Sequence, residues 1–223
     1  MNRLSSWFCK IFLGPIVKRL FIKEVNGLEN IPKRNFILAV NHQSHLDQIL
    51  TGFICVPREF TYLGQTDSYT GFTKLFLYIL YFLAGVIHVN RKKEESRKKA
   101  KERAIEALKK GISLVIYPEG TRTRTGKIQE GKFGVAKIFL KTDVPILPVG
   151  IVGAFELMPP GKGFPKIKRI IKIHIGRPLF FEEELIIAKK IKEDSVEYQR
   201  IFKKITDKVM TEISSLIDQT LKT

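Results

Sequence analysis

Cysteine and acidic residues are both scarce in this 223-residue chain. Only Cys9 and Cys55 are present, too few for a disulfide framework or a cysteine-rich zinc site, and this usage is typical of a reducing, intracellular environment. The 22 Asp and Glu residues are outnumbered by 39 Lys and Arg residues, which gives a formal net charge of +17. A charge of this sign favours polyanionic partners, namely nucleic acid, anionic lipid or a phosphorylated substrate.

Long hydrophobic runs are also missing from the sequence. The longest uncharged apolar run, Leu75 to Ile87, is too short to cross a bilayer as a helix. Near the N-terminus, Lys10, Gly14 and Pro15 interrupt the apolar residues, and no small-residue cleavage pattern follows. We therefore expect neither a transmembrane helix nor a secretory signal peptide.

The N-terminal residues have the pattern of an amphipathic helix. Helical periodicity over residues 2–12 places one arc of apolar side chains, Leu4, Trp7, Phe8, Ile11 and Phe12, opposite Asn2, Arg3, Ser6 and Lys10. An aromatic face beside basic side chains suits a helix lying in the headgroup region of an anionic membrane, and the alternative is docking of that face onto the domain core. We predict a membrane-associating helix over residues 1–23 and an α/β domain over residues 24–223, which includes the C-terminal helices.

Short apolar runs alternate with helical patterns through the rest of the chain. Residues 36–40 are continuously apolar, as expected for a strand that is buried on both faces. Comparable runs occupy residues 86–89, 113–117, 146–151 and 170–175, and helical patterns cover residues 94–110, 132–141 and the C-terminal region. This alternation predicts an α/β fold with a largely parallel central sheet flanked by helices.

A histidine and an aspartate follow the first of these runs in the segment Asn41-His42-Gln43-Ser44-His45-Leu46-Asp47. In a turn from strand to helix, the Asp47 carboxylate can hydrogen-bond one imidazole nitrogen of His42 and leave the other nitrogen free as a base. Such a histidine can take the proton of an alcohol that attacks a carbonyl.

The residues alone leave three other interpretations of this segment open. His42 and Asp47 could cap a helix, Ser44 could be a nucleophile, or His42 and His45 could bind a metal ion. Ser44 lacks the flanking glycines of a nucleophile elbow, and no acidic or cysteine cluster nearby completes a metal shell. We therefore predict that the site contains no metal.

A second polar segment, Tyr117-Pro118-Glu119-Gly120-Thr121-Arg122, follows another predicted strand, where open α/β sheets place their sites. Gly120 permits close backbone approach, Thr121 offers a hydroxyl donor, and the Arg122 guanidinium matches the geometry of phosphate oxygens. Arg91 closes a third predicted strand and could supply a second guanidinium to the same phosphate. The two segments together favour a base beside a phosphate site.

These residues resemble the motifs of the glycerolipid acyltransferases. NHQSHLD at 41–47 is similar to their first motif, NHxSxxD, and residues 117–123 are similar to their F-P-E-G-T-R-S motif. Residues 85–91 and 144–149 resemble the second and fourth motifs, so four motifs occur in the order of the family between roughly residues 36 and 150.

The resemblance implies the glycerolipid acyltransferase fold and a defined reaction. A fatty acyl group passes from acyl-CoA or acyl carrier protein to the free hydroxyl of 1-acyl-glycerol-3-phosphate (lysophosphatidic acid), which gives phosphatidic acid. His42 is then the general base and Asp47 its orienting partner. No cofactor beyond the acyl-donor substrate and no covalent enzyme intermediate is implied. The expected location is an anionic membrane surface on the cytoplasmic face, with a monotopic or peripheral attachment.

For the phosphate of the acceptor, the resemblance implies that Arg91 and Arg122 hold it. The residues that shape this part of the site are then Glu119, Gly120 and Thr121.

One position departs from the family pattern. Members commonly carry a lysine in a phrase like A-K-x-x-L after the first motif, whereas Gln65 stands here, and Lys74 could substitute for it only from a different position in the chain. The missing point charge leaves a second hypothesis, an acyltransferase of the same superfamily that acts on another lysolipid or on an amino-acid lipid.

Two non-enzymatic hypotheses remain. A nucleic-acid-binding protein is compatible with the charge, but the sequence has no recognised nucleic-acid motif, so we expect no nucleic-acid partner. The second is a catalytically inactive, lipid-binding relative, and the presence of both His42 and Asp47 argues against it.

Overall fold

A seven-stranded sheet lies at the centre of the structure, a computed structural model that describes residues 1, 3–65, 85–90 and 92–222. The strands are β1 (Ile22–Asn26), β2 (Ile37–Val40), β3 (Phe60–Gln65), β4 (Ile87–Val89), β5 (Ser113–Ile116), β6 (Ile146–Val152) and β7 (Ile171–Ile175). Their order is β1-β7-β6-β2-β5-β3-β4, and every neighbouring pair is parallel except β6 and β7. The prediction of an α/β fold with a largely parallel sheet is therefore confirmed.

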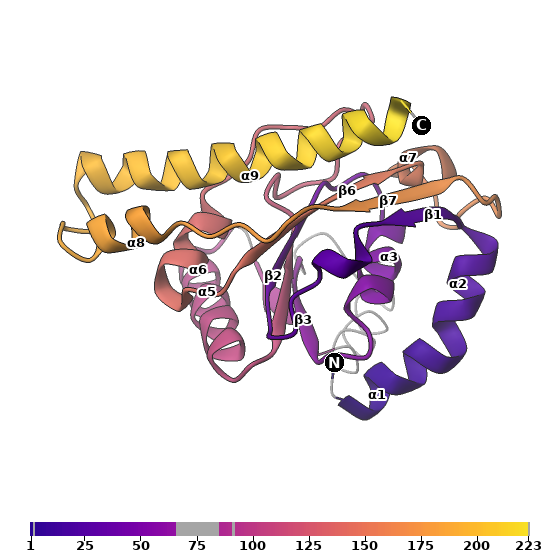
Figure 1. Cartoon of the computed structure of the whole chain (residues 1–223), viewed down its shortest axis with the longest axis horizontal. Helices are drawn as coiled ribbons and strands as arrows, with labels where there is room; N and C mark the ends of the chain where they lie inside the picture. The colour runs from indigo at the N-terminus through magenta and orange to yellow at the C-terminus, as the bar shows by residue number, and fades with distance from the viewer. Residues whose placement is uncertain (2, 66–84, 91, 223) are drawn as a thin grey trace.

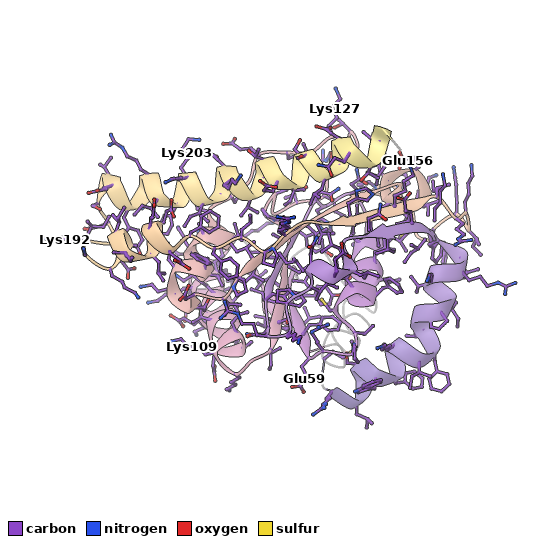
Figure 2. The ribbon with its side chains drawn as sticks, viewed as in Figure 1. Glu59, Lys109, Lys127, Glu156, Lys192 and Lys203 are labelled. Atoms are coloured by element: carbon purple, nitrogen blue, oxygen red, sulfur yellow. The ribbon has the colours of Figure 1, made fainter. Side chains whose placement is uncertain are left out.

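Helices cover both faces of this sheet (Figure 1). They are α1 (Arg3–Phe8), the π-helical η1 (Cys9–Leu13), α2 (Gly14–Leu20), the 3₁₀ turn η2 (Leu28–Asn30), α3 (Leu46–Cys55), α5 (Glu94–Lys109), α6 (Gly134–Thr142), α7 (Ala154–Leu157), α8 (Glu182–Ala188) and α9 (Val196–Lys222). One core joins α3 to the sheet, and α5, α6, α8 and α9 build a second core on the other face. Figure 2 shows the labelled Lys109, Lys192 and Lys203 on the outside of the molecule.

The continuously apolar run of β2 follows from its central position. Leu38 and Val40 pack into the core on the α3 face, whereas Ile37 and Ala39 pack into the core formed with α5, α6 and α9. All four side chains are 0% exposed. Because successive side chains of a strand point to opposite faces, a strand covered by helices on both sides has no position left for a polar residue.

The last helix, α9, crosses the sheet closely over β6. A Cβ atom built on Gly150 would lie 3.0 Å from the backbone nitrogen of Ile217, so only glycine lets the helix approach the strand this far. The predicted C-terminal helix is thus part of the core of the domain.

Two strands were not predicted from the sequence. Among the described strands, the edge strand β1 pairs with β7 alone and contains the charged Lys23 and Glu24, and β3 contains Thr61 and Gly64, so neither forms an apolar run. Because β1 begins at Ile22, the sheet starts slightly before the predicted domain boundary at residue 24.

Several sequence-based predictions concern residues outside the described part of the chain. These are Arg91, Lys74, most of the run from Leu75 to Ile87, and the side chain of Gln65. Among the described residues, no helix combines the length and the apolar character needed to cross a bilayer.

Candidate active site

The polar segment after β2 is held to the sheet by Asn41. This side chain is 2% exposed; its Nδ2 donates to the carbonyl oxygen of Ile151 and its Oδ1 accepts from the Ile151 backbone nitrogen, each at 2.8 Å. The amide therefore continues the pairing between β2 and β6 by one side chain. As a result, the position at which the chain leaves the sheet, and with it the position of His42, is fixed.

His42 and Asp47 make the contact that the sequence predicts. The distance between His42 Nδ1 and Asp47 Oδ2 is 2.9 Å, and Asp47 lies fully buried in the first turn of α3. Because a carboxylate accepts hydrogen bonds, this contact favours the tautomer with the proton on Nδ1 and the lone pair on Nε2. Among the described residues, none hydrogen-bonds Nε2.

The same carboxylate oxygen also closes the turn. Asp47 Oδ2 accepts the backbone N–H groups of Gln43 at 2.7 Å and of Ser44 at 2.8 Å. The helix-capping interpretation and the orienting interpretation of Asp47 therefore describe one arrangement, in which the cap holds the carboxylate where it meets the imidazole.

An aromatic ring lies flat against the His42 imidazole. The rings of His42 and Tyr117 are stacked, with centroids 3.9 Å apart and an interplanar angle of 13°. The Tyr117 hydroxyl is 3.4 Å from Thr51 Oγ1, and Thr51 in turn donates to the carbonyl oxygen of Asp47 at 2.8 Å. The sequence placed Tyr117 in the second polar segment but indicated no role for it. Tyr117 reaches the His42 ring because β2 and β5 are neighbours in the sheet, which the sequence does not reveal.

The Glu119 carboxylate is hydrogen-bonded to the backbone of His42. One Glu119 oxygen accepts the backbone N–H of His42 at 2.7 Å, and the other accepts the backbone N–H of Gln129 at 2.9 Å. The side chain is 2% exposed, and burial raises the pKa of its carboxyl above the usual range. The carbonyl oxygen of His42 accepts from the backbone nitrogen of Thr123 at 2.9 Å, so the loop after β5 holds both backbone polar groups of the histidine.

A cavity of about 510 Å³ opens in front of the imidazole. Its lining residues are His42, Thr121, Arg122, Thr123, Arg124, Thr125, Gln129 and Pro160. Three of the predicted site residues therefore meet in one space, whereas Gly120 occupies the preceding turn with φ of 72°. Arg124 was not predicted, and its place two residues after Arg122 in a basic motif was the available signal. Two guanidinium groups beside a base suit an anionic substrate that carries a reacting hydroxyl.

The two alternative roles for this segment find little support in the geometry. The Ser44 hydroxyl is fully buried and donates to the carbonyl oxygen of Met158 at 2.7 Å, so Ser44 anchors the chain and does not face the cavity as a nucleophile. Within the described part of the chain, no three His, Cys, Asp or Glu side chains form a cluster that could hold a metal ion. The metal-free site stays a prediction.

His45 is kept neutral by its surroundings. Burial above all, together with the positive charge of Arg122 and the neighbouring His42, lowers the pKa of His45 from 6.5 to about 4. At neutral pH the imidazole therefore adds no charge to the cavity.

The low pKa of His45 predicts a dependence of stability on pH. Between about pH 6.5 and pH 4 the unfolded chain binds a proton at this residue that the folded chain does not bind, so the free energy of unfolding decreases as the pH falls. We expect this residue to contribute on the order of 1–2 kcal/mol, after allowing for partial solvent exposure. Urea unfolding of the wild type and His45→Gln at pH 7 and pH 5 tests this, since the variant should lose less stability. Equal losses in the two proteins would contradict the assignment.

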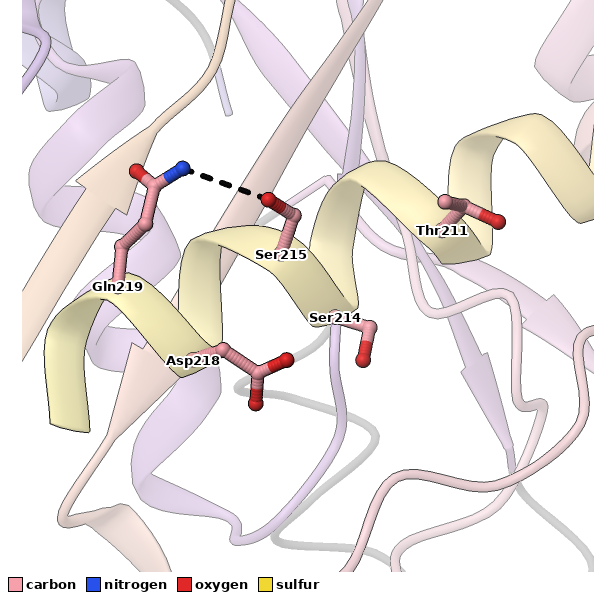
Figure 3. A pocket seen from close by; sticks show the side chains of 5 residues that line it. All are labelled: Thr211, Ser214, Ser215, Asp218 and Gln219. Atoms are coloured by element: carbon pink, nitrogen blue, oxygen red, sulfur yellow. Dashed lines mark hydrogen bonds between the residues drawn. The ribbon is translucent and has the colours of Figure 1, made fainter. Parts of the chain in front are cut away.

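A second hollow, of about 500 Å³, lies along α9 (Figure 3). Its lining residues are Thr211, Ser214, Ser215, Asp218 and Gln219, all from one helix. The Gln219 amide donates to Ser215 Oγ at 3.3 Å, and Asp218 is the one charged side chain in the lining. A carboxylate and hydroxyls on a single helix lack a base with an orienting partner, so we assign the candidate active site to the cavity at His42.

Comparisons with known proteins agree with this geometry. The family model for acyltransferases matches residues 23–152, more than half of the chain. The chain belongs to the acyltransferase family. The matched region runs from the second residue of β1 to the end of β6 and contains both polar segments of the site. The expectation of this family from the motifs is therefore confirmed.

Named members of the acyltransferase family are similar over much of the chain. The chloroplastic 1-acyl-sn-glycerol-3-phosphate acyltransferase of Brassica napus is 26% identical over 187 residues, covering 80% of this chain and 51% of that protein. The 1-acyl-sn-glycerol-3-phosphate acyltransferase of Borreliella burgdorferi is 38% identical over 128 residues, covering 56% of this chain and 49% of that protein. The chain thus spans about half the length of these two relatives.

A solved acyltransferase structure has the same fold. The crystal structure of the 1-acyl-sn-glycerophosphate acyltransferase PlsC from Thermotoga maritima superposes with a TM-score of 0.64 at 25% identity, covering 96% of this chain and 83% of that chain. The glycerolipid acyltransferase fold expected from the motifs is thereby confirmed.

Proposed function

We propose that this protein transfers a fatty acyl group from acyl-CoA or acyl carrier protein to the free hydroxyl of 1-acyl-glycerol-3-phosphate, which forms phosphatidic acid. The observation that carries the proposal is the 2.9 Å contact between Asp47 Oδ2 and Nδ1 of His42, which lines the same cavity as Arg122. The names of the similar proteins support the choice of acceptor.

The proposed reaction is direct attack of the acceptor hydroxyl on the thioester. His42 Nε2 takes the hydroxyl proton while the oxygen attacks the thioester carbonyl, and the resulting tetrahedral oxyanion expels the thiolate. The imidazolium then returns the proton to the leaving sulfur. The buried Asp47 carboxylate stabilises the transient imidazolium, and the stacked Tyr117 ring keeps the imidazole plane from rotating out of line.

The acceptor phosphate binds in the same cavity in this proposal. Arg122 holds it with its guanidinium group, and Thr121 and Arg124 also line the cavity. The role of Arg91 rests on the motif. Glu119 and Gly120 contribute by building the loop, since the Glu119 carboxylate is hydrogen-bonded to His42 and Gln129.

An assay with purified protein tests the activity. The protein is supplied in detergent with lysophosphatidic acid and either acyl-CoA or acyl carrier protein as donor, and thiol release and phosphatidic acid formation are followed together. A panel of other lysolipids and an amino-acid lipid covers the alternative acceptor that Gln65 suggests. Failure to form any acylated product with either donor would refute the enzymatic proposal.

Removing the Arg122 guanidinium should weaken acceptor binding. A charge-assisted contact to phosphate contributes about 1.5–3 kcal/mol, so we expect the KM for lysophosphatidic acid to rise by about 10- to 100-fold in Arg122→Ala. The KM for the acyl donor should change far less. Arg200→Ala, an exposed arginine on α9, is the matched control. An unchanged acceptor KM would show that Arg122 does not bind the phosphate.

We further propose that the N-terminal arm, α1 to α2, lies on the cytoplasmic face of an anionic membrane. It contacts the domain through Ser6, which donates to the carbonyl oxygen of Arg58 at 2.6 Å, through Gly14 near Phe53, and through the apolar Val17 and Leu20, which pack against the core. Seven other large apolar side chains of the arm are between 44% and 82% exposed: Leu4, Trp7, Phe8, Ile11, Phe12, Leu13 and Ile16. Exposed aromatic residues beside Arg3 and Lys10 favour a membrane over the core-docking alternative.

Polar substitutions on the arm should release the protein from vesicles. Because each apolar side chain adds about 1 kcal/mol or more when it enters a bilayer, Phe8→Ser/Phe12→Ser should weaken binding to phosphatidylglycerol-containing vesicles by at least about tenfold. Sedimentation with vesicles measures the partition coefficient. Leu28→Ser, 52% exposed on η2, serves as the control. Equal partitioning of all three proteins would argue against the arm as a membrane anchor.

A further inference from the structure

The connection between α7 and β7 carries the most exposed aromatic side chain in the described part of the chain. In this connection, residues 159–169, here named the Phe164 loop, Phe164 is 90% exposed and Ile167 is 73% exposed. A Cβ atom built on Gly161 or Gly163 would meet no other atom within 4 Å, so the loop projects from the domain. Burial in the domain therefore does not explain why a phenylalanine and an isoleucine stand at its surface.

The charges of the Phe164 loop are all of one sign. Its sequence, PPGKGFPKIKR, contains four basic residues and no acidic one. The basic side chains, Lys162, Lys166, Lys168 and Arg169, all belong to exposed residues. Apolar side chains interspersed with lysines and an arginine complement the boundary between the headgroups and the acyl chains of an anionic leaflet.

The two ends of the Phe164 loop connect the cavity with the N-terminal arm. At its start, the carbonyl oxygen of Met158 accepts a hydrogen bond from Ser44, and Pro160 lines the cavity that contains His42. At its end, Arg169 Nε donates at 2.8 Å to the carbonyl oxygen of Ile22, the first residue of β1, two residues after the end of α2. Figure 1 shows α2 and the connection from α7 to β7 at the same end of the molecule.

We propose that the Phe164 loop is a second membrane contact, separate from the N-terminal arm and placed beside the mouth of the active-site cavity. Phe164 and Ile167 enter the acyl boundary of an anionic leaflet, while the four basic side chains bind lipid phosphates. The proposal rests on the proposed function in one respect, because it explains how a membrane-embedded acceptor reaches His42. A second copy of this chain is a poorer occupant, because two surfaces with four positive charges each would repel.

The first test measures binding and is independent of catalysis. Phe164→Ser/Ile167→Ser, made in the chain with its N-terminal arm intact, is compared with the wild type on vesicles of phosphatidylcholine and phosphatidylglycerol. We expect its partition coefficient to fall by about tenfold. Ile186→Ser is the matched control because Ile186 is 54% exposed on α8, the helix that lies at the end of the molecule opposite α2 (Figure 1). Unchanged binding of the double variant would overturn the proposal, as would a shift in oligomeric state without vesicles that accounted for the loss.

A fluorescence measurement locates the loop directly. Trp7 is the only tryptophan of the chain, so Trp7→Phe/Phe164→Trp carries a single reporter in the loop. Its emission should shift to shorter wavelength on addition of the same vesicles, whereas Trp7→Phe/Ile186→Trp should show no shift. Absence of a shift at position 164, with vesicle binding verified by sedimentation, would contradict insertion of the loop.

Activity separates this inference from the proposed function. We expect the double variant to acylate a short-chain, monomeric lysophosphatidic acid like the wild type, but to acylate acceptor embedded in vesicles about tenfold more slowly. Equal rates of both proteins on vesicles would overturn the loop proposal while leaving the activity intact. An inactive wild type would refute the proposed function, and the binding and fluorescence tests would still decide the role of the loop.

Discussion

Replacing His42 with alanine should lower kcat by about 10²- to 10⁴-fold, the usual contribution of a positioned general base. Three residues hold His42 in place. Asp47 hydrogen-bonds Nδ1 and Tyr117 stacks on the ring, whereas Glu119 accepts a hydrogen bond from the backbone nitrogen. Alanine keeps the two backbone contacts and removes only the ring. Turnover should therefore collapse while the fold and vesicle binding are retained.

The measurement is steady-state kinetics with lysophosphatidic acid and acyl-CoA, together with circular dichroism and vesicle sedimentation. His174→Gln is a suitable control because His174 is also poorly exposed, at 8%, but lies on β7 and pairs with Asn26 across the sheet edge. Near wild-type kcat in His42→Ala would remove His42 from the mechanism. A folded variant that no longer bound lipid would instead assign His42 a role in binding.

Asp47→Asn should have the second-largest effect, with kcat reduced by about 10²- to 10⁴-fold. Asp47 Oδ2 accepts from His42 and from two backbone N–H groups, so an asparagine oxygen can still satisfy the backbone of Gln43 and Ser44. A neutral amide cannot, however, stabilise the imidazolium as the carboxylate does. If the amide nitrogen takes the place of Oδ2 instead, it faces His42 Nδ1, the proton moves to Nε2 and the base is lost, and the backbone N–H groups of Gln43 and Ser44 lose their acceptor.

Nitrogen chemical shifts of His42 distinguish this explanation from general damage. The wild type should show the tautomer protonated on Nδ1, and Asp47→Asn should show a larger share protonated on Nε2. A buried polar change of this kind should also lower the free energy of unfolding by about 1–3 kcal/mol. A large loss of stability with an unchanged tautomer would make Asp47 a structural cap only.

Much of the fold could be predicted because the sheet is buried on both faces. A strand such as β2 must then be continuously apolar, and the helices between the strands carry their own periodicity. The edge strand β1 escaped prediction because it is paired only with β7 and tolerates the charged Lys23 and Glu24. The N-terminal arm was predicted as an amphipathic helix, but its period could not tell which residues meet the domain; Ser6, Gly14, Val17 and Leu20 do so.

The amino-acid sequence by itself was enough to predict the candidate site, because His42, Asp47 and Arg122 follow apolar runs, and the carboxyl ends of parallel strands meet at one edge of a sheet. The contact between His42 and Asp47 could be predicted from the sequence because only a short turn separates the two residues. Contacts between distant segments were decided by the tertiary structure. Glu119 meets the backbone of His42 across 77 residues, and Tyr117 stacks on its ring, because β2 and β5 are neighbours in the sheet. Two side chains that meet because their strands are neighbours in the sheet leave no pattern in the sequence from which the contact could be predicted.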